Sequence, residues 1–412
     1  MAKRMIIGES GGPTPVIDWE VAGALDVAQK SGWQIYGMIN GPGAGLRTTR
    51  IKPKKDQYER IAENLKLLGV TAVLYFGGND SAAQLLGLSK VADIAAIHGI
   101  KTIDNDLPAT HHCPGYGSAT LFNATALKNV DNDFSGYGVK GNFDVGGEIV
   151  EGWNVAPVAI YQVMGRKAGW LAQGTGFAKV DPKGDIDRDR APHIILSKEV
   201  TFDEEEFLGK LNNVISQRGG AAIVVQEDLT DRKTGKSLAE LYADSLVRDE
   251  SGNIQHGRFE SFSPGMFLAQ LVSKKLKVEC VLGEVKDVAL VPQHIQRSCM
   301  MSPVDASEAY KVGAASVDAL NDGLTGKSVV LKREQGHTVT DVTDMENIAA
   351  KERSVEMEYI DGICGPTKKF VDEFIYLIGG PAAIPHYSRS TFNAVEIPAA
   401  IRSNPYVKKE KS

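Results

Sequence analysis

Short runs of apolar residues alternate with amphipathic stretches along the chain. The apolar runs predict strands at residues 5–8, 33–39, 70–76, 158–163, 193–197 and 221–226. Helical spacing predicts helices at residues 19–30, 58–68, 82 into the nineties, 202–216 and 261–276. Strands and helices that alternate in this way are typical of a parallel sheet covered on both faces. The pattern therefore predicts an α/β fold with two doubly wound lobes facing one cleft, a first lobe of residues 1–126 plus 296–412 and a second of residues 127–295.

Composition narrows the class of protein. The 412 residues suffice for two or three domains, and the 46 basic and 52 acidic residues give a net charge of −6, which argues against a nucleic-acid partner. No apolar run approaches the roughly 18 residues of a membrane helix, so we expect no membrane association. The four cysteines form no Cys-x-x-Cys pair, so we expect neither disulfides nor zinc, and a cytoplasmic location.

Glycine is the one residue type in excess, with 43 residues. Gly11-Gly12 and Gly77-Gly78 directly follow predicted strands, where ligands bind in open α/β sheets. Glycine lets the backbone approach an anion closely, and a following helix offers free N–H groups. The alternative is a tight turn without a ligand, which we favour for either pair taken alone.

Two carboxylates, Asp104 and Asp106, follow another apolar stretch. An extended segment would project both side chains to the same face. One could then bind Mg²⁺ while the other accepts a proton from a hydroxyl. The alternative is a solvated Asp/Asn turn, and the spacing does not choose between them.

Three further polar positions follow predicted strands. Arg166, which we expect at a helix N-terminus, suits a phosphate or a developing transition-state charge, or is an ordinary surface arginine. His294 and Arg297 could contact an anionic ligand, or be polar loop residues. Glu227 could hold sugar hydroxyls, or cap the next turn.

These segments, in this order, resemble the phosphofructokinase family. The shared motifs are Gly-Gly near the N-terminus, Gly-Gly-x-Asp-Ser, Thr-Ile-Asp-Asn-Asp, Met-Gly-Arg-x-Ala-Gly and His-Ile-Gln-Arg. The resemblance covers roughly residues 4–320 and is loose beyond them. It implies the phosphofructokinase fold and phosphoryl transfer to the 1-hydroxyl of fructose 6-phosphate, a step of glycolysis.

The resemblance also implies a role for each matching residue. Asp104 would be the general base, Thr102 would bind the transferring phosphoryl group or the sugar, Arg166 would stabilise charge on that phosphoryl group, and Asp106 would hold Mg²⁺ with Asn79 beside it. Fructose 6-phosphate would be held by Met164, Gly165, Glu227, His294 and Arg297. The donor phosphates would be lined by Gly11, Arg50, Asp80 and Lys101.

Two positions indicate which donor is used. Asp80 replaces a glycine that leaves room for the nucleotide in ATP-using relatives, and its carboxylate would repel the α-phosphate region of ATP. Lys101 replaces another glycine, and its ammonium could neutralise pyrophosphate. Both changes resemble the pyrophosphate-dependent branch, so pyrophosphate is the predicted donor. The competing explanation is chance surface variation.

The chain also departs from the family pattern. Asn79 replaces an aspartate near the metal, Pro157 replaces a cation that reaches a neighbouring subunit's sugar phosphate, and Gln162 replaces a glutamate. Only ten residues separate Ile39 from Arg50, where relatives have a longer donor-site wall. These departures keep two alternatives open: a kinase for another sugar phosphate, such as sedoheptulose 7-phosphate, and a non-catalytic sugar-phosphate-binding subunit. Family members are usually dimers or tetramers, so the resemblance also implies a homodimer or homotetramer.

Overall fold

The structure is a computed structural model of the chain. It describes residues 3–38, 53, 56–134, 140–153, 155–242, 262–276, 284–297 and 300–385. Arg50 and the whole of the short segment between Ile39 and Arg50 lie outside the described residues, so the predictions for them remain predictions.

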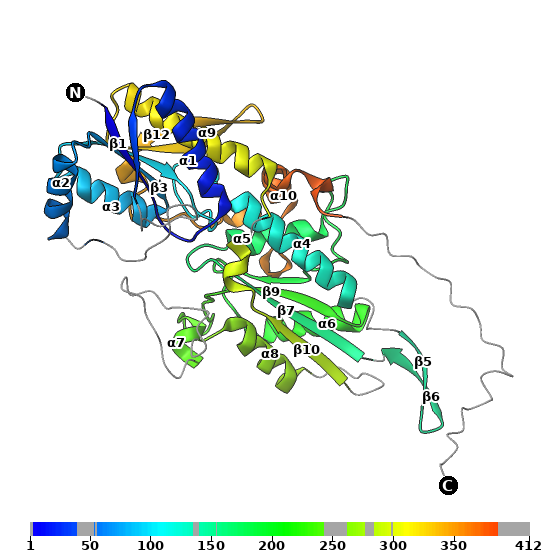
Figure 1. The fold of residues 1–412 in the computed structure, drawn as a ribbon. Coiled ribbons are helices and arrows are strands. Elements are labelled where there is room, and N and C mark those ends of the chain that lie inside the picture. The colour runs from blue at the N-terminus through cyan, green and yellow to red at the C-terminus, as the bar shows by residue number, and fades with distance from the viewer. Residues whose placement is uncertain are drawn as a thin grey trace, which may run out of the picture.

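Two parallel sheets organise the molecule, and each forms one lobe with its surrounding helices (Figure 1). The first sheet has the strand order β12-β11-β4-β3-β1-β2 and is parallel except for the antiparallel pair β11–β12. Its strands are β1 (Arg4–Glu9), β2 (Gln34–Gly37), β3 (Ala72–Gly77), β4 (Ala95–Ile100), β11 (Lys327–Glu334) and β12 (His337–Asp344). The central strands are almost wholly buried, as the continuous apolar runs predict.

The second sheet is fully parallel, with the order β10-β7-β9-β8. Its strands are β7 (Val155–Val163), β8 (Ile194–Leu196), β9 (Ala221–Gln226) and β10 (Glu284–Leu290). A separate antiparallel hairpin of β5 (Lys140–Val145) and β6 (Glu148–Trp153) projects away from this sheet (Figure 1). The predicted α/β class with two doubly wound lobes is confirmed.

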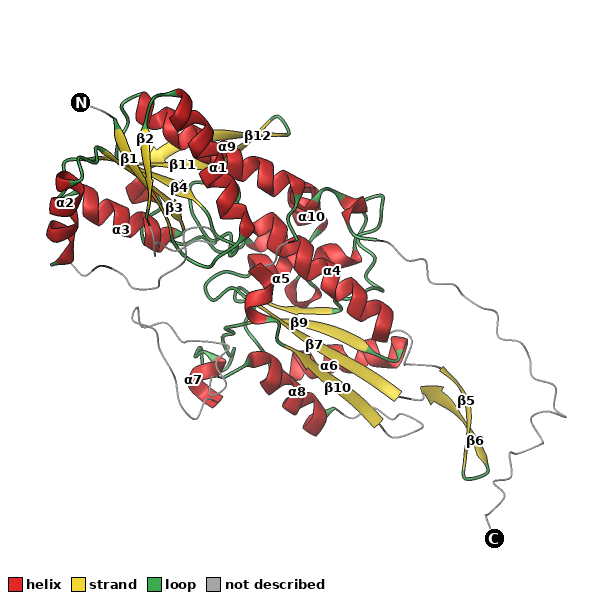
Figure 2. Ribbon diagram, in the orientation of Figure 1, coloured by secondary structure: helices red, strands yellow, loops and turns green. Residues whose placement is uncertain are grey.

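Helices cover the sheets and run between them (Figure 2). The helices that pack around the first sheet are α1 (Pro15–Lys30), α2 (Gln57–Leu67), α3 (Asn79–Ser89) and α9 (Pro303–Asn321). The others are α4 (Tyr116–Phe134), α5 (Trp170–Gly174), α6 (Glu204–Arg218), α7 (Leu238–Tyr242), α8 (Pro264–Lys275) and α10 (Lys368–Phe374). Helices α1 and α9 pack so closely that a Cβ atom on Gly313 would lie 1.8 Å from the carbonyl oxygen of Glu20. None of the helices in the described part of the chain is long and apolar enough to cross a membrane.

One predicted helix boundary is wrong. Helix α3 begins at Asn79 and ends at Ser89, so it does not reach the nineties. The chain must be extended from Ala95 onward, because β4 pairs with β3 on one side and β11 on the other.

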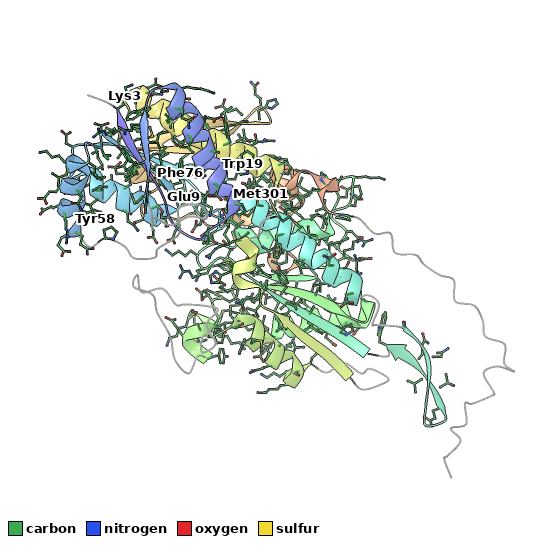
Figure 3. All side chains as sticks on the ribbon, in the orientation of Figure 1. Lys3, Glu9, Trp19, Tyr58, Phe76 and Met301 are labelled. Atoms are coloured by element: carbon green, nitrogen blue, oxygen red, sulfur yellow. The ribbon has the colours of Figure 1, made fainter. Side chains whose placement is uncertain are left out.

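Within the first sheet, Glu9 of β1 lies opposite Phe76 of β3, and the two labelled side chains lie close together in Figure 3.

The C-terminal part, for which the sequence indicated no purpose, joins the two lobes. Strands β11 and β12 extend the first sheet, whereas the aromatic rings of α10 pack against the second lobe. Phe374 lies 5.4 Å from the ring of Trp170, and Phe370 lies 5.6 Å from the ring of Phe177. Trp170 is fully buried in this cluster. Residues beyond 320 therefore complete both the first sheet and the core between the lobes.

Candidate active site

The candidate site begins at the carboxyl ends of β1, β3 and β4, which parallel pairing brings to one edge of the first sheet. The turn after β1 carries Gly11 and Gly12, and Gly11 has a φ of +100°, a left-handed conformation that favours glycine. A Cβ atom on Gly12 would lie 2.2 Å from Nε of Arg297. A side chain at position 12 would displace the guanidinium of Arg297, which lies directly against the backbone there.

Lys101 lies under the same turn. It is 4% exposed, and its Nζ donates a hydrogen bond to the carbonyl oxygen of Gly12 (2.8 Å). Burial lowers the pKa of Lys101 to about 8, although the buried carboxylate of Glu20 acts to raise it. The Lys101 ammonium is therefore held against the turn at Gly11 and Gly12. This is the turn at which we expect the donor phosphates to bind.

The loop after β4 differs from the prediction. Asp104 lies in a turn and Asn105 has a φ of +54°, so the prediction that the segment is extended is wrong. Asparagine tolerates this left-handed conformation, and its side-chain oxygen accepts a hydrogen bond from the backbone N–H of Cys113 (2.9 Å). The turn is further supported by a hydrogen bond from the Asp104 N–H to Oγ1 of Thr102 (3.2 Å).

The two carboxylates nevertheless interact. Burial and, to a smaller extent, the neighbouring charge of Asp104 together raise the pKa of Asp106 to about 7. Burial also raises the pKa of Asp104, whereas the cations Arg297, Arg166 and Lys101 act to lower it. Asp104 therefore lies within the field of these three cations and of Lys167, and all of them except Lys101 belong to segments beyond the first sheet.

The turn after β7 supplies the opposite side of the site. Gly165 has a φ of +109°, and the side chain of Gln226 at the end of β9 donates hydrogen bonds to the carbonyl oxygens of Gly165 (2.7 Å) and Ala168 (3.0 Å). The predicted helix N-terminus at Arg166 is wrong, because helix α5 begins only at Trp170. Arg166 is instead held by a turn that Gln226 clamps from a neighbouring strand.

Glu227 follows Gln226 and is 5% exposed. Burial and the charge of Asp104 raise its pKa, Arg166 and Arg297 act to lower it, and the net pKa is about 7. The structure thus brings Glu227 into the same group of charges as Asp104, as its predicted place at a strand end requires.

The segment His294 to Arg297 lies in a short 3-10 helix, η2 (Gln293–Arg297), rather than in a loop. Nη1 of Arg297 donates to Nδ1 of His294 (2.8 Å). Gln296, which sequence reasoning missed, is buried and accepts a hydrogen bond from the N–H of Met164 (3.0 Å) while donating to the carbonyl oxygen of Gln162 (3.1 Å). Gln296 therefore fixes η2 against the end of β7.

Asn79 and Asp80 begin helix α3, and Asp80 is exposed. The amide nitrogen of Asn79 donates to the carbonyl oxygen of Lys351 (3.1 Å) and to Oε1 of Glu352 (3.4 Å). Glu352 also forms an ion pair with Lys167. Sequence reasoning missed both members of this ion pair, because Glu352 lies in the part of the chain where the family resemblance is loose.

Two residues that depart from the family pattern, Pro157 and Gln162, lie on β7. Pro157 lies near the start of β7, opposite Lys286 in the register with β10, whereas Met164 follows the other end of β7. Gln162 is buried, and its Oε1 accepts hydrogen bonds from Oγ of Ser263 (2.7 Å) and the N–H of Gly265 (2.9 Å) at the start of α8. Gln162 thus has a structural partner in helix α8.

The chemistry of the loop fits a divalent cation. Asp104 and Asp106 are neighbouring carboxylates whose charges oppose each other, and a bound cation would relieve that repulsion. The side-chain oxygen of Asn79 already accepts a hydrogen bond from the Asp80 N–H (2.9 Å). Within the described residues no group of three or more histidine, cysteine, aspartate or glutamate side chains is arranged to hold a metal, so a cation here would depend on one or two carboxylates and on substrate oxygens.

Two α/β lobes that bring buried carboxylates, cations and glycine turns together have the chemical groups that phosphoryl transfer requires. The family profile of phosphofructokinase matches residues 34–140 and 154–320, which is more than half of the chain. The chain belongs to the phosphofructokinase family. The predicted resemblance, including that to the pyrophosphate-dependent branch, is confirmed.

Three similar proteins illustrate the relationship. A pyrophosphate–fructose 6-phosphate 1-phosphotransferase of Xanthomonas campestris pv. campestris is 30% identical over 370 residues, covering 80% of this chain and 79% of that protein. Another from Rhodospirillum rubrum is 28% identical over 395 residues, covering 87% and 89%. The crystal structure of a pyrophosphate-dependent phosphofructokinase from Marinobacter aquaeolei has a TM-score of 0.71 at 22% identity, covers 96% of this chain and 100% of that chain, and shows the shared fold.

Proposed function

We propose that this enzyme transfers a phosphoryl group from pyrophosphate to the 1-hydroxyl of fructose 6-phosphate, giving fructose 1,6-bisphosphate and phosphate. The observation that carries the proposal is the position of Asp104 among Arg297, Arg166 and Lys101. A carboxylate surrounded by cations can accept a proton while the cations hold anionic substrates on both sides of it. The names of the most similar relatives support the same reaction.

In the proposed reaction the 1-hydroxyl oxygen attacks one phosphorus of pyrophosphate, and the bond from that phosphorus to the bridging oxygen breaks. Asp104 accepts the hydroxyl proton, and the phosphate that leaves keeps the electron pair of the broken bond. Arg166 stabilises the charge on the transferring group, with Thr102 beside Asp104 as a further contact. Such positioning and charge neutralisation account for most of the catalysis in phosphoryl transfer.

Mg²⁺ held by Asp106 would supply further charge neutralisation on the donor oxygens. Lys101 and the turn at Gly11 and Gly12 would bind pyrophosphate, and Asp80 at the start of α3 would disfavour a nucleotide. These donor contacts require no room for a base or ribose, so a small donor fits them.

The acceptor would be held from the second lobe by Met164, Gly165 and Glu227, together with His294 and Arg297 of η2. Glu227 supplies hydrogen-bond acceptors for sugar hydroxyls, whereas the arginine suits a sugar phosphate. We further propose that the enzyme acts in glycolysis in the cytoplasm as a homodimer or homotetramer, with the domain division at residues 127 and 295.

A matrix of two donors and two acceptors tests the proposal on the purified full-length chain. The donors are Mg-pyrophosphate and Mg-ATP, and the acceptors are fructose 6-phosphate and sedoheptulose 7-phosphate. We expect turnover with pyrophosphate and fructose 6-phosphate, and its loss in Asp104→Asn. Turnover with ATP alone would refute the donor, and a preference for sedoheptulose 7-phosphate would refute the acceptor. No turnover with any pair would favour a non-catalytic binding protein.

A further inference from the structure

One short stretch of the C-terminal part, residues 350–355, contacts segments of the candidate site from both lobes. We call it the crossing segment. At its start the N–H of Ala350 donates to the carbonyl oxygen of Asn79 (3.3 Å), and Asn79 returns a hydrogen bond to Lys351. At its end the N–H of Val355 and the N–H of Gly169 donate to the same oxygen of Glu199 (3.0 and 2.9 Å). The crossing segment therefore reaches from helix α3 of the first lobe to the turn before α5 of the second.

Arg353 lies at the centre of the crossing segment and binds the carboxylate loop. Its backbone N–H donates to the carbonyl oxygen of Asp106 (2.7 Å). Its guanidinium donates to the carbonyl oxygens of Thr110 (2.7 Å), His111 (3.1 Å) and Asn105 (3.4 Å). One side chain thus holds both ends of the turn that carries Asp106.

The same residue binds the second lobe. The guanidinium carbon of Arg353 lies 4.4 Å from the ring centroid of Trp170, and the indole N–H of Trp170 donates to the Arg353 carbonyl oxygen (3.3 Å). Trp170 begins α5, four residues after Arg166, and is fully buried. Its ring cannot move without moving the aromatic cluster around it.

We propose that Arg353 is a positioning residue for phosphoryl transfer, which holds the Asp104–Asp106 loop at a fixed distance from the Arg166 turn by bridging that loop to Trp170. The inference rests on the proposed function for its kinetic consequence, but the bridge itself is independent of the reaction. The proposed base and the phosphoryl-binding arginine come from different lobes, and Arg353 contacts the loop of the one and the tryptophan that follows the other. A planar guanidinium suits this bridge because it can serve several carbonyl oxygens and stack on a ring at once, which an ammonium cannot do.

The test compares Arg353→Lys with a matched control, Arg333→Lys. Arg333 lies in the same C-terminal part, is also half-buried, stacks on the ring of Tyr376 (3.7 Å) and donates to Thr338 (3.3 Å), and none of these contacts involves the carboxylate loop. For Arg353→Lys we expect kcat to fall about 10- to 100-fold, since small misplacements of reacting groups have effects of this order, with KM for both substrates within about threefold of wild type. For Arg333→Lys we expect kcat within about twofold of wild type. A folded Arg353→Lys with kcat within about twofold, or an equal fall in Arg333→Lys, would overturn the proposal.

A second measurement needs no substrate. Amide hydrogen exchange in peptides covering residues 104–112 should become faster in Arg353→Lys and stay unchanged in Arg333→Lys. If wild-type protein shows no turnover, the proposed function fails while this comparison still decides the bridge, and unchanged exchange refutes it. If Arg353→Lys does not fold, Trp170→Phe removes the indole N–H bond while keeping an aromatic ring, and an unchanged kcat in that variant refutes the bridge.

Discussion

Glu227→Gln should make the protein more stable at alkaline pH while weakening its hold on the sugar phosphate. The carboxyl group is 5% exposed, and burial raises its pKa from 4.5 to about 7 in the folded protein. A raised carboxyl pKa means that the folded state binds more protons than the unfolded chain between these two values, so stability falls as the pH rises through that range. Above about pH 7 the loss of folding stability caused by the ionised Glu227 is close to its full value.

The size of the effect follows from the two pKa values. A rise from 4.5 to about 7 corresponds to about 3 kcal/mol at pH 8.5, of which about 2 kcal/mol develops between pH 5.5 and 8.5. Glutamine has nearly the same shape, and its carbonyl oxygen can still accept a hydrogen bond from the Gly165 N–H. The variant carries no titrating group, so the stability difference from wild type should grow by about 2 kcal/mol over this pH interval.

Denaturant titrations of wild type and variant at pH 5.5 and 8.5, without sugar phosphate, measure this difference. Glu358→Gln serves as the control, because Glu358 is an exposed carboxylate in an ion pair with Lys369 (2.7 Å) and such pairs contribute at most about 1 kcal/mol. Calorimetry at pH 8.5 should show roughly 10- to 100-fold weaker binding of fructose 6-phosphate to Glu227→Gln, since hydrogen bonds to charged groups contribute about 1.5–3 kcal/mol. A stability difference that is the same at both pH values would refute the reasoning.

Three further predictions concern the base and two glycines. Asp104→Asn should lower kcat by about 10²- to 10⁴-fold and leave binding of fructose 6-phosphate by calorimetry nearly unchanged; retained turnover would show that another group takes the proton. Gly12→Ala places a Cβ atom 2.2 Å from Nε of Arg297, so the guanidinium must move by about 1 Å. Steady-state assays should then show about a 100-fold loss in kcat/KM. An unchanged kcat/KM would mean that Arg297 does not act from this position. Gly313→Ala places a Cβ atom against the backbone of α1 and should destabilise the protein by about 1–3 kcal/mol or more in denaturant titrations. The control Gly209→Ala places its Cβ atom in open space on helix α6 and should stabilise the protein by up to about 1 kcal/mol. Equal effects of the two glycine substitutions would contradict the close packing of α1 and α9.

The alternation of apolar runs and amphipathic stretches was enough to predict the α/β class, three of the six described strands of the first sheet and three of the four described strands of the second. A strand buried on both faces needs a continuous apolar run, and this requirement is local. The approximate place of the site was predictable for a related reason. Parallel strands all end at the same edge, so polar and glycine residues that follow strands, such as Gly12, Asp104 and Glu227, must gather there. Motif order along the chain added the family and therefore the expected chemistry.

The shape of the site depends on contacts that no local pattern records. The turn at Asp104 was wrongly predicted to be extended. The left-handed conformation of Asn105 that makes the turn is stabilised by a hydrogen bond with Cys113, and the residues next to Asn105 in the sequence do not indicate this bond. Gln226 and Gln296 fix the turn and 3-10 helix of the second lobe, yet a single buried glutamine has no sequence signature.

Arg353 is the extreme case, since its guanidinium binds carbonyl oxygens 242 to 248 residues away in the chain. Local sequence patterns were sufficient to predict many of the strands and helices and the polar residues at the carboxyl ends of the strands. The separation between the carboxylate loop of the first lobe and the Arg166 turn of the second depends on the tertiary structure, because Arg353 of the crossing segment packs between them.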